Sequence, residues 1–108
     1  MEKIVIGIDV SKLTLDICIQ ENGVNRFDTI ANTEKAIKSF LKQFVKRQNI
    51  LIGMENTGRF NILLYNVLIQ HSFAVYVINP LHLKKSMGLV RGKNDKIDSE
   101  RIAVFLLK

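Results

Sequence analysis

The chain has 108 residues, 47% of them hydrophobic and 24% charged, and its formal net charge is +6. This composition excludes a disordered tail and suits one folded domain with its own core. No apolar run approaches the ~18–20 residues of a membrane span, and the first residues lack the long apolar segment of a signal peptide. The single cysteine, Cys18, excludes an internal disulfide, and no Cys/His cluster has zinc spacing. We therefore expect a cytoplasmic protein with no membrane partner.

The first thirty residues predict three strands. Residues 3–9 are a nearly continuous apolar run ending in the carboxylate of Asp9, which is typical of a buried central strand. Residues 13–20 alternate between apolar and polar side chains, which predicts a half-exposed strand. A turn signal at residues 21–23 then predicts that residues 24–30 return antiparallel.

The next segment predicts a helix. Asn32-Thr33 offers an N-cap, and an apolar stripe runs from Ala36 to Val45 before Asn49 ends the element. Its lysines lie off the stripe and are interpreted as a solvated face.

Strands and helices alternate in the rest of the chain. Residues 50–54 predict a buried strand ending at Glu55. Residues 59–70 predict a helix so apolar on all sides that both sides should be covered. Residues 73–78 predict a fifth strand, and a closing helix is expected from about residue 95. This order, β-β-β-α-β-α-β-α, predicts an α/β fold with a mixed five-stranded sheet and helices on both faces.

Four smaller assignments follow from local pattern. Ser11 has no histidine base near it in sequence, so a turn or cap role is favoured over a nucleophile. Thr57 is predicted to cap the second helix, and Phe60 and Tyr65 are predicted to lie in the core rather than stack on bases.

Two acids, Asp95 and Asp98, open the closing helix. Their spacing of three places both on one face of its first turn. Helix-capping explains such residues by itself, but Arg91, Lys93, Lys96 and Arg101 surround them. Acids ringed by positive charge suit a metal site that acts on a polyanion.

Two further acids end predicted strands. Ligand sites in open α/β sheets gather beyond the carboxyl ends of strands, so Asp9 and Glu55 would share a crevice if their strands are neighbours. The closing helix could bring Asp95 and Asp98 there. Four carboxylates would repel without a cation, and their natural use is to hold Mg²⁺ or Mn²⁺. Two such ions about 4 Å apart suit phosphodiester chemistry.

The charge balance supports a nucleic-acid substrate. With those four acids assigned to metal, six acids remain against sixteen lysines and arginines, so the rest of the surface should attract a phosphate backbone. Lys12 and Arg59 follow site acids and are candidates for phosphate contact, with plain surface positions as the alternative. A basic segment is interpreted as a substrate-contacting arm, through Lys84, Lys85, Arg91, Lys93 and Lys96.

Four blocks of the sequence, in this order, resemble the insertion sequence 110 family of transposases. They are Gly-Ile-Asp-Val-Ser-Lys at 7–12, Met-Glu-Asn-Thr-Gly at 54–58, Val-Ile-Asn-Pro at 77–80 and Lys-Asn-Asp-Lys-Ile-Asp-Ser at 93–99. The resemblance spans the whole chain and implies a ribonuclease-H-like, RuvC-like fold. It makes Asp9, Glu55, Asp95 and Asp98 the catalytic, metal-binding set.

The resemblance also implies DNA cleavage and strand exchange at mobile-element ends and targets, guided by a bridge RNA in a homo-oligomer. The apolar helical pattern at residues 102–107 stops without a cap, so we expect residues 1–108 to be an N-terminal piece of a longer transposase. The family's C-terminal domain supplies a serine, and the piece could be inactive without it.

Three other functions stay open on sequence alone. One is a stand-alone nuclease of the Holliday-junction type. Another is a fragment of an actin-like or sugar-kinase ATPase, which shares the β-β-β-α-β-α core but needs glycine-rich phosphate loops that residues 10–12 do not provide. The last is a non-catalytic nucleic-acid-binding module in which the acids are helix caps.

Overall fold

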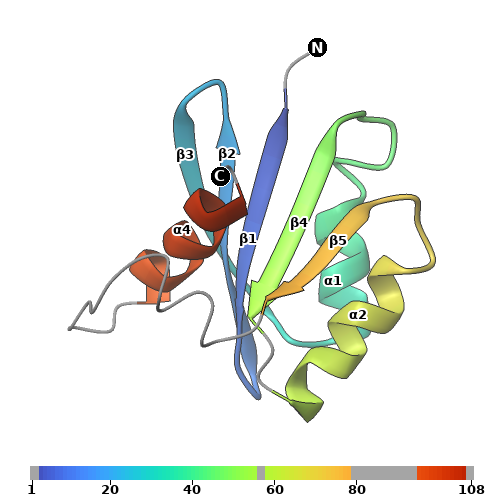
Figure 1. The fold of residues 1–108 in the computed structure, drawn as a ribbon. Helices are drawn as coiled ribbons and strands as arrows, with labels where there is room; N and C mark the ends of the chain where they lie inside the picture. Colours follow the sequence, from blue (N-terminus) through green and yellow to red (C-terminus); the bar gives the residue numbers. More distant parts are fainter. Residues whose placement is uncertain (1–2, 56–57, 79–94, 107–108) are drawn as a thin grey trace.

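The fold is a mixed sheet between two helical layers (Figure 1). The computed structural model describes residues 3–55, 58–78 and 95–106, with only the backbone at 95–98, 101 and 105. The sheet has five strands in the order β3-β2-β1-β4-β5. Helices α1 and α2 cover one face and α4 crosses the other. The elements are β1 (Ile4–Val10), β2 (Thr14–Glu21), β3 (Val24–Ala31), α1 (Glu34–Leu41), β4 (Ile50–Glu55), η1 (Arg59–Asn61), α2 (Ile62–Leu68), β5 (Ala74–Ile78) and α4 (Asp95–Leu106).

The strands confirm the predicted order of elements and the predicted antiparallel return of the third strand. The central strand β1 pairs antiparallel with β2 and parallel with β4. The edge strands β3 and β5 pair with β2 and β4, antiparallel and parallel respectively. Strands one and four are therefore adjacent, as the crevice hypothesis required.

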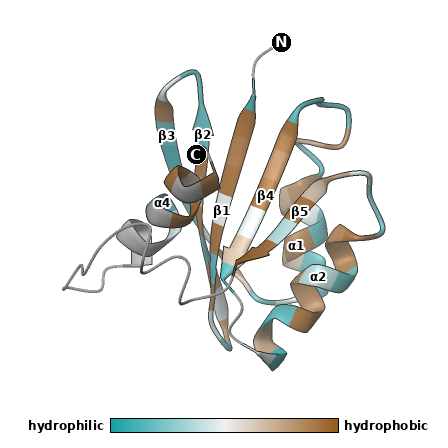
Figure 2. Ribbon diagram, in the orientation of Figure 1, coloured by the Kyte–Doolittle hydropathy of each residue, from teal (hydrophilic) through white to brown (hydrophobic). Residues whose placement is uncertain are grey.

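The face under α1 and α2 carries the larger core. Alternate residues of β1 point there, namely Ile4, Ile6 and Ile8, and each is at most 1% exposed. Burying one such side chain contributes about 1.5–3 kcal/mol. Figure 2 shows β1 and β4 as mostly hydrophobic, whereas the edge strand β3 mixes hydrophobic and hydrophilic residues. The remaining buried members include Leu15, Ile17, Ile19, Ile37, Phe40, Leu41, Phe44, Ile52, Met54, Leu64, Val67 and Leu68.

The opposite face has a smaller core, built to admit α4 closely. A Cβ on Gly7 would lie 2.3 Å from the Ser99 carbonyl oxygen and 2.5 Å from the Ala103 nitrogen. Glycine is therefore required if the helix backbone is to rest on β1. The buried apolar residues around this contact are Val5, Cys18, Ile78, Ile102, Ala103 and Leu106.

The prediction that the second strand is half-exposed is wrong. Leu13, expected on its buried side, is 74% exposed and precedes β2. Asp16 and Cys18, expected on its open side, are 8% and 0% exposed. The reason lies in the tertiary structure. The 12-residue helix α4 comes from the far end of the chain and packs over this face. The alternation of residues within one strand cannot reveal such a contact.

The first helix begins as predicted but ends earlier. The Thr33 hydroxyl accepts a hydrogen bond from the Ala36 nitrogen, 3.2 Å away, which confirms the N-cap. The helix stops at Leu41, and successive turns follow in which Phe44 donates to Leu41 and Arg47 donates to Phe44. Phe44 stays buried, but Val45 turns outward, so the predicted stripe loses its last member.

The second helix is covered on one side only, which contradicts the prediction of cover on both. It begins with the single 3₁₀ turn η1 and continues as α2, which buries Leu64, Val67 and Leu68. Its outer residues Ile62, Tyr65 and Ile69 are exposed. The core prediction is thus wrong for Tyr65, whereas Phe60 packs against the core. Thr57 lies outside the described residues.

Candidate metal-binding site

Asp9 and Glu55 stand at equivalent places on neighbouring parallel strands. Ile8 of β1 is in register with Met54 of β4. Asp9 and Glu55 are the next residues along the two strands, so they are adjacent across the sheet. Both side chains are partly exposed. The strand positions expected from the sequence are therefore realised for these two acids.

The face on which they lie follows from the glycines two residues earlier. Gly7 touches the backbone of α4, and a Cβ on Gly53 would lie 2.6 Å from the Leu106 Cδ1 atom. Because side chains alternate along a strand, Asp9 and Glu55 share the face of Gly7 and Gly53. They lie on the α4 side of the sheet.

Helix α4 brings the second acid pair toward this edge of the sheet. It begins on the side where β1 and β4 end and runs back toward their first residues (Figure 1). Asp95 and Asp98 belong to its first turn, and a spacing of three places them on one helix face. Their side chains lie outside the described residues.

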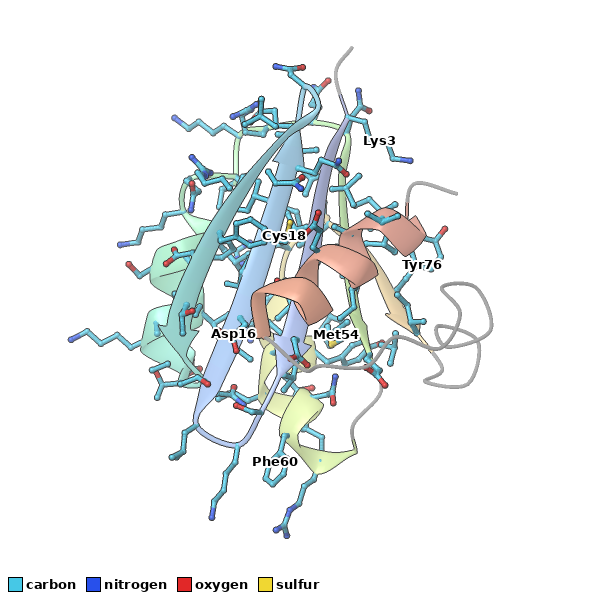
Figure 3. The ribbon with its side chains drawn as sticks, turned by 90° about the vertical axis from the view of Figure 1, so that its left-hand side faces the viewer. Lys3, Asp16, Cys18, Met54, Phe60 and Tyr76 are labelled. Atoms are coloured by element: carbon cyan, nitrogen blue, oxygen red, sulfur yellow. The ribbon has the colours of Figure 1, made fainter. Side chains whose placement is uncertain are left out.

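A third described acid, Asp16, continues the row of Asp9 and Glu55. Asp16 of β2 is the register partner of Asp9, and Thr29 of β3 is the register partner of Asp16. The Thr29 hydroxyl donates a hydrogen bond of 2.8 Å to Asp16 Oδ1. Figure 3 shows Asp16 low on the sheet, beside the end at which α4 begins, with Cys18 higher along the same strand.

The loops at this edge are tied together by two asparagines. The Asn61 side-chain amide donates to the Glu55 carbonyl oxygen at 2.8 Å, which fixes η1 to the end of β4. The Asn32 side-chain amide donates to the carbonyl oxygens of Ser11, at 2.9 Å, and Phe60, at 3.3 Å. These bonds join the segments after β1, β3 and β4, so the acids stand on a braced edge.

Ser11 has the turn role predicted for it. Its hydroxyl donates to the Thr14 carbonyl oxygen at 2.9 Å, which closes the turn between β1 and β2.

Only two of the predicted phosphate-contacting residues have described side chains. Lys12 and Arg59 are exposed. Lys12 follows Ser11 and Arg59 precedes Phe60, the two residues whose carbonyl oxygens Asn32 binds. Both basic residues therefore lie at the edge of the sheet that carries Asp9 and Glu55. The Arg59 guanidinium lies 5.3 Å from the centre of the Phe60 ring. Lys84, Lys85, Arg91 and Lys93 lie outside the described residues, as does the side chain of Lys96 in α4.

The nearby Cys18 is a soft sulfur ligand, which does not suit the hard cations that carboxylates bind. Burial, reinforced by the negative charge of Glu100, raises the pKa of Cys18 to about 11. The thiol is therefore protonated at neutral pH.

The two strand carboxylates are the right type of ligand for a hard cation, but two ligands are too few to hold one. Asp9 and Glu55 offer oxygen ligands, which Mg²⁺ prefers. Among the side chains that the structure describes, no group of three or more His, Cys, Asp or Glu is close enough to hold a metal ion. Two ligands from the strands leave places for donors from α4.

Sequence reasoning missed Asp16, Asn32 and Asn61. The side chains of Asn32 and Asn61 donate hydrogen bonds to backbone carbonyl oxygens of other segments, and these partners are known only from the fold. Asp16 lies on the polar side of the alternation at residues 13–20, so the sequence carries no signal of its burial.

Comparison with known proteins defines the class. The family model described as "Transposase", that of insertion sequence 110 elements with the Asp-Glu-Asp-Asp motif, matches residues 6–108. The chain belongs to the insertion sequence 110 family of transposases. This confirms the resemblance and favours a transposase over the ATPase-fragment alternative. No curated protein matches the sequence.

Solved structures define the fold. The chain is similar to Thermus thermophilus RuvC in complex with a Holliday junction substrate, with a TM-score of 0.61, 13% identity, and cover of 94% of this chain and 90% of that one. A second Thermus thermophilus RuvC structure gives a TM-score of 0.60, 10% identity, and cover of 94% and 91%. The predicted RuvC-like, ribonuclease-H-like fold is thus confirmed. No helix within the described part of the chain is long and apolar enough to span a membrane.

Proposed function

We propose that this domain carries out metal-dependent cleavage and strand transfer of DNA phosphodiesters for a mobile element. The observation that carries the proposal is the adjacency of Asp9 and Glu55 at the ends of β1 and β4, on the face that α4 covers. Membership of a transposase family supports DNA as the substrate. The similar fold of RuvC, which was solved with a Holliday junction, supports it further.

Asp9, Glu55, Asp95 and Asp98 are proposed to hold two divalent ions, Mg²⁺ or Mn²⁺. When bound, such ions activate the attacking oxygen and stabilise the leaving one. The strand acids are held in place by the sheet register, and the Asn61 bond fixes the backbone of Glu55. Helix α4 supplies the other two acids as a unit, since a helix turn holds residues three apart on one face.

The positive charge around the acids is proposed to bind the DNA backbone. Lys12 and Arg59 stand exposed at the acidic edge. They can contact phosphates on either side of the scissile bond, while the basic arm at residues 84–96 extends the contact.

Further partners are proposed from the family alone. They are a bridge RNA that selects the DNA, a C-terminal domain beyond residue 108 that supplies a serine, and further copies of the transposase in the active assembly. The cytoplasm is the proposed location.

Substitution of single acids tests the proposal. In the complete transposase, Asp9→Asn, Glu55→Gln and Asp98→Asn should each lower Mg²⁺-dependent cleavage of a supercoiled donor plasmid by about 10²–10³-fold, because each removes several kcal/mol of transition-state stabilisation. Asp28→Asn on β3 is the matched control, since this exposed acid precedes Thr29 and so lies on the other face. Full cleavage by any of the three site variants would sink the assignment.

A further inference from the structure

One buried acid lies directly beside the proposed metal ligands. Asp16 is 8% exposed, and its register partner across the β1–β2 pair is Asp9. We propose that Asp16 is a positioning residue that raises the cation affinity of Asp9 and Glu55 without binding the ion itself. This inference rests on the proposed function of those two acids.

Asp16 lies where a negative charge acts strongly on its neighbour across the strand pair. Residues directly opposite on antiparallel strands have Cβ atoms about 4.5–5.5 Å apart, and like charges there destabilise a sheet. A carboxylate that is nearly buried loses hydration as well. A negative charge at Asp16 therefore adds to the negative potential at Asp9, which favours a cation there.

The row to which Asp16 belongs shows which neighbours those are. Glu55, Asp9 and Asp16 follow one another across β4, β1 and β2 on the α4 side. Ile78 and Thr29 complete the row on the two edge strands. Negative charge thus accumulates along one line of the sheet, at the end where α4 begins.

Asp16 is held as a neighbour of the site rather than as a ligand. The described acids of this row do not come close enough together to form a metal group of three. One of the two carboxylate oxygens of Asp16 accepts the Thr29 hydroxyl at 2.8 Å. Hydrogen bonds to an ionised carboxylate favour the charged form and fix its direction. Thr29 accordingly fixes the direction of the Asp16 carboxylate beside Asp9.

The test measures Mn²⁺ binding rather than activity. Isothermal titration calorimetry of the 108-residue chain with MnCl₂ should show about tenfold weaker binding for Asp16→Asn, because the variant removes one negative charge beside Asp9 and so weakens the attraction for a divalent ion. Asn has the shape of Asp and still accepts the Thr29 hydroxyl, so a purely structural role of Asp16 would leave the affinity unchanged. Thermal unfolding without metal, read on each variant, establishes that the fold is kept.

Three controls separate this inference from the proposed function. Asp9→Asn should abolish Mn²⁺ binding, whereas Asp28→Asn, which removes one charge from the other face, should leave it unchanged. Thr29→Val should weaken binding by about threefold, since it releases the Asp16 carboxylate without removing its charge. Thr29 is an exposed residue of an edge strand, so the Thr29→Val variant keeps the test available if Asp16→Asn does not fold.

The outcomes are distinct. If the unmodified chain binds no Mn²⁺, the metal site proposed for it fails and the role of Asp16 fails with it. If the chain binds Mn²⁺ through Asp9 but Asp16→Asn and Thr29→Val bind equally well, the role of Asp16 alone is overturned.

Discussion

The two faces of the central strand are built on opposite principles. Even-numbered residues of β1 are large and apolar and fill the core under α1 and α2. Odd-numbered residues include Gly7, which lets α4 approach, and Asp9, which starts the acidic row. Large buried side chains stabilise one face. The other face carries glycine instead, so that a helix with its acids can reach the sheet. The comparison teaches that stability and function are assigned to alternate residues of the same strand.

Removing volume from the apolar face should have the largest effect. Ile6→Ala should lower the free energy of unfolding by about 2–5 kcal/mol, because the cavity cannot close in a fully buried site. Urea denaturation followed by circular dichroism measures the loss. Ile62→Ala is the matched control, since Ile62 is 57% exposed on α2, and it should change stability by no more than about 0.5 kcal/mol. Equal losses for the two variants would contradict the core described above.

Adding volume to the other face should cost less, and it should act through α4. Gly7→Ala should destabilise the fold by about 1–3 kcal/mol, because the added Cβ meets backbone atoms of Ser99 and Ala103. Hydrogen exchange should show faster exchange in α4 than in α1. If α4 keeps its protection in this variant, the close contact is not what holds it.

The second glycine of that face provides a finer comparison. The three atoms nearest to a Cβ at Gly53 all belong to the Leu106 side chain, and a leucine side chain can change rotamer. Gly53→Ala should therefore cost about 1 kcal/mol or less and leave the exchange of α4 nearly unchanged. A greater loss than for Gly7→Ala would reverse the order that the contacts predict.

The last effect is absent at neutral pH and concerns the thiol beneath α4. The folded pKa of Cys18 is raised from 9.0 to about 11, first by burial and then by Glu100. The unfolded thiol ionises first, so stability from this group is present below pH 9 and is lost as pH rises from about 9 to about 11. Denaturation at several pH values should show this slope, and Cys18→Ala should lack it. An unchanged slope in Cys18→Ala would assign the loss to other groups.

Much of the fold could be predicted because the pattern of apolar residues carries it. The apolar run into Asp9 and the one into Glu55 predicted two central strands, and Asn32-Thr33 predicted the start of α1. The adjacency of Asp9 and Glu55 was predicted only on the condition that the first and fourth strands are neighbours. The order of elements leaves that pairing open, and the structure supplies it.

The rest could not be predicted because it depends on contacts between distant segments. Burial of Asp16 and Cys18 requires α4, which begins about eighty residues later in the chain. The early end of α1 depends on turns that still bury Phe44, and an apolar stripe cannot distinguish these from a longer helix. A usable signal was nevertheless present. Gly7-Ile8-Asp9 and Gly53-Met54-Glu55 repeat a glycine two residues before an acid, and the structure explains both glycines by the approach of α4.

The central claim is that the acidic row at the edge of the sheet holds divalent metal. Crystals of this chain soaked in MnCl₂, with data collected for the anomalous signal of manganese, test it most directly. We expect anomalous density within bonding distance of the carboxylate oxygens of Asp9 and Glu55, completed by donors from the first turn of α4. Density at other surface acids with none between Asp9 and Glu55 would contradict the account.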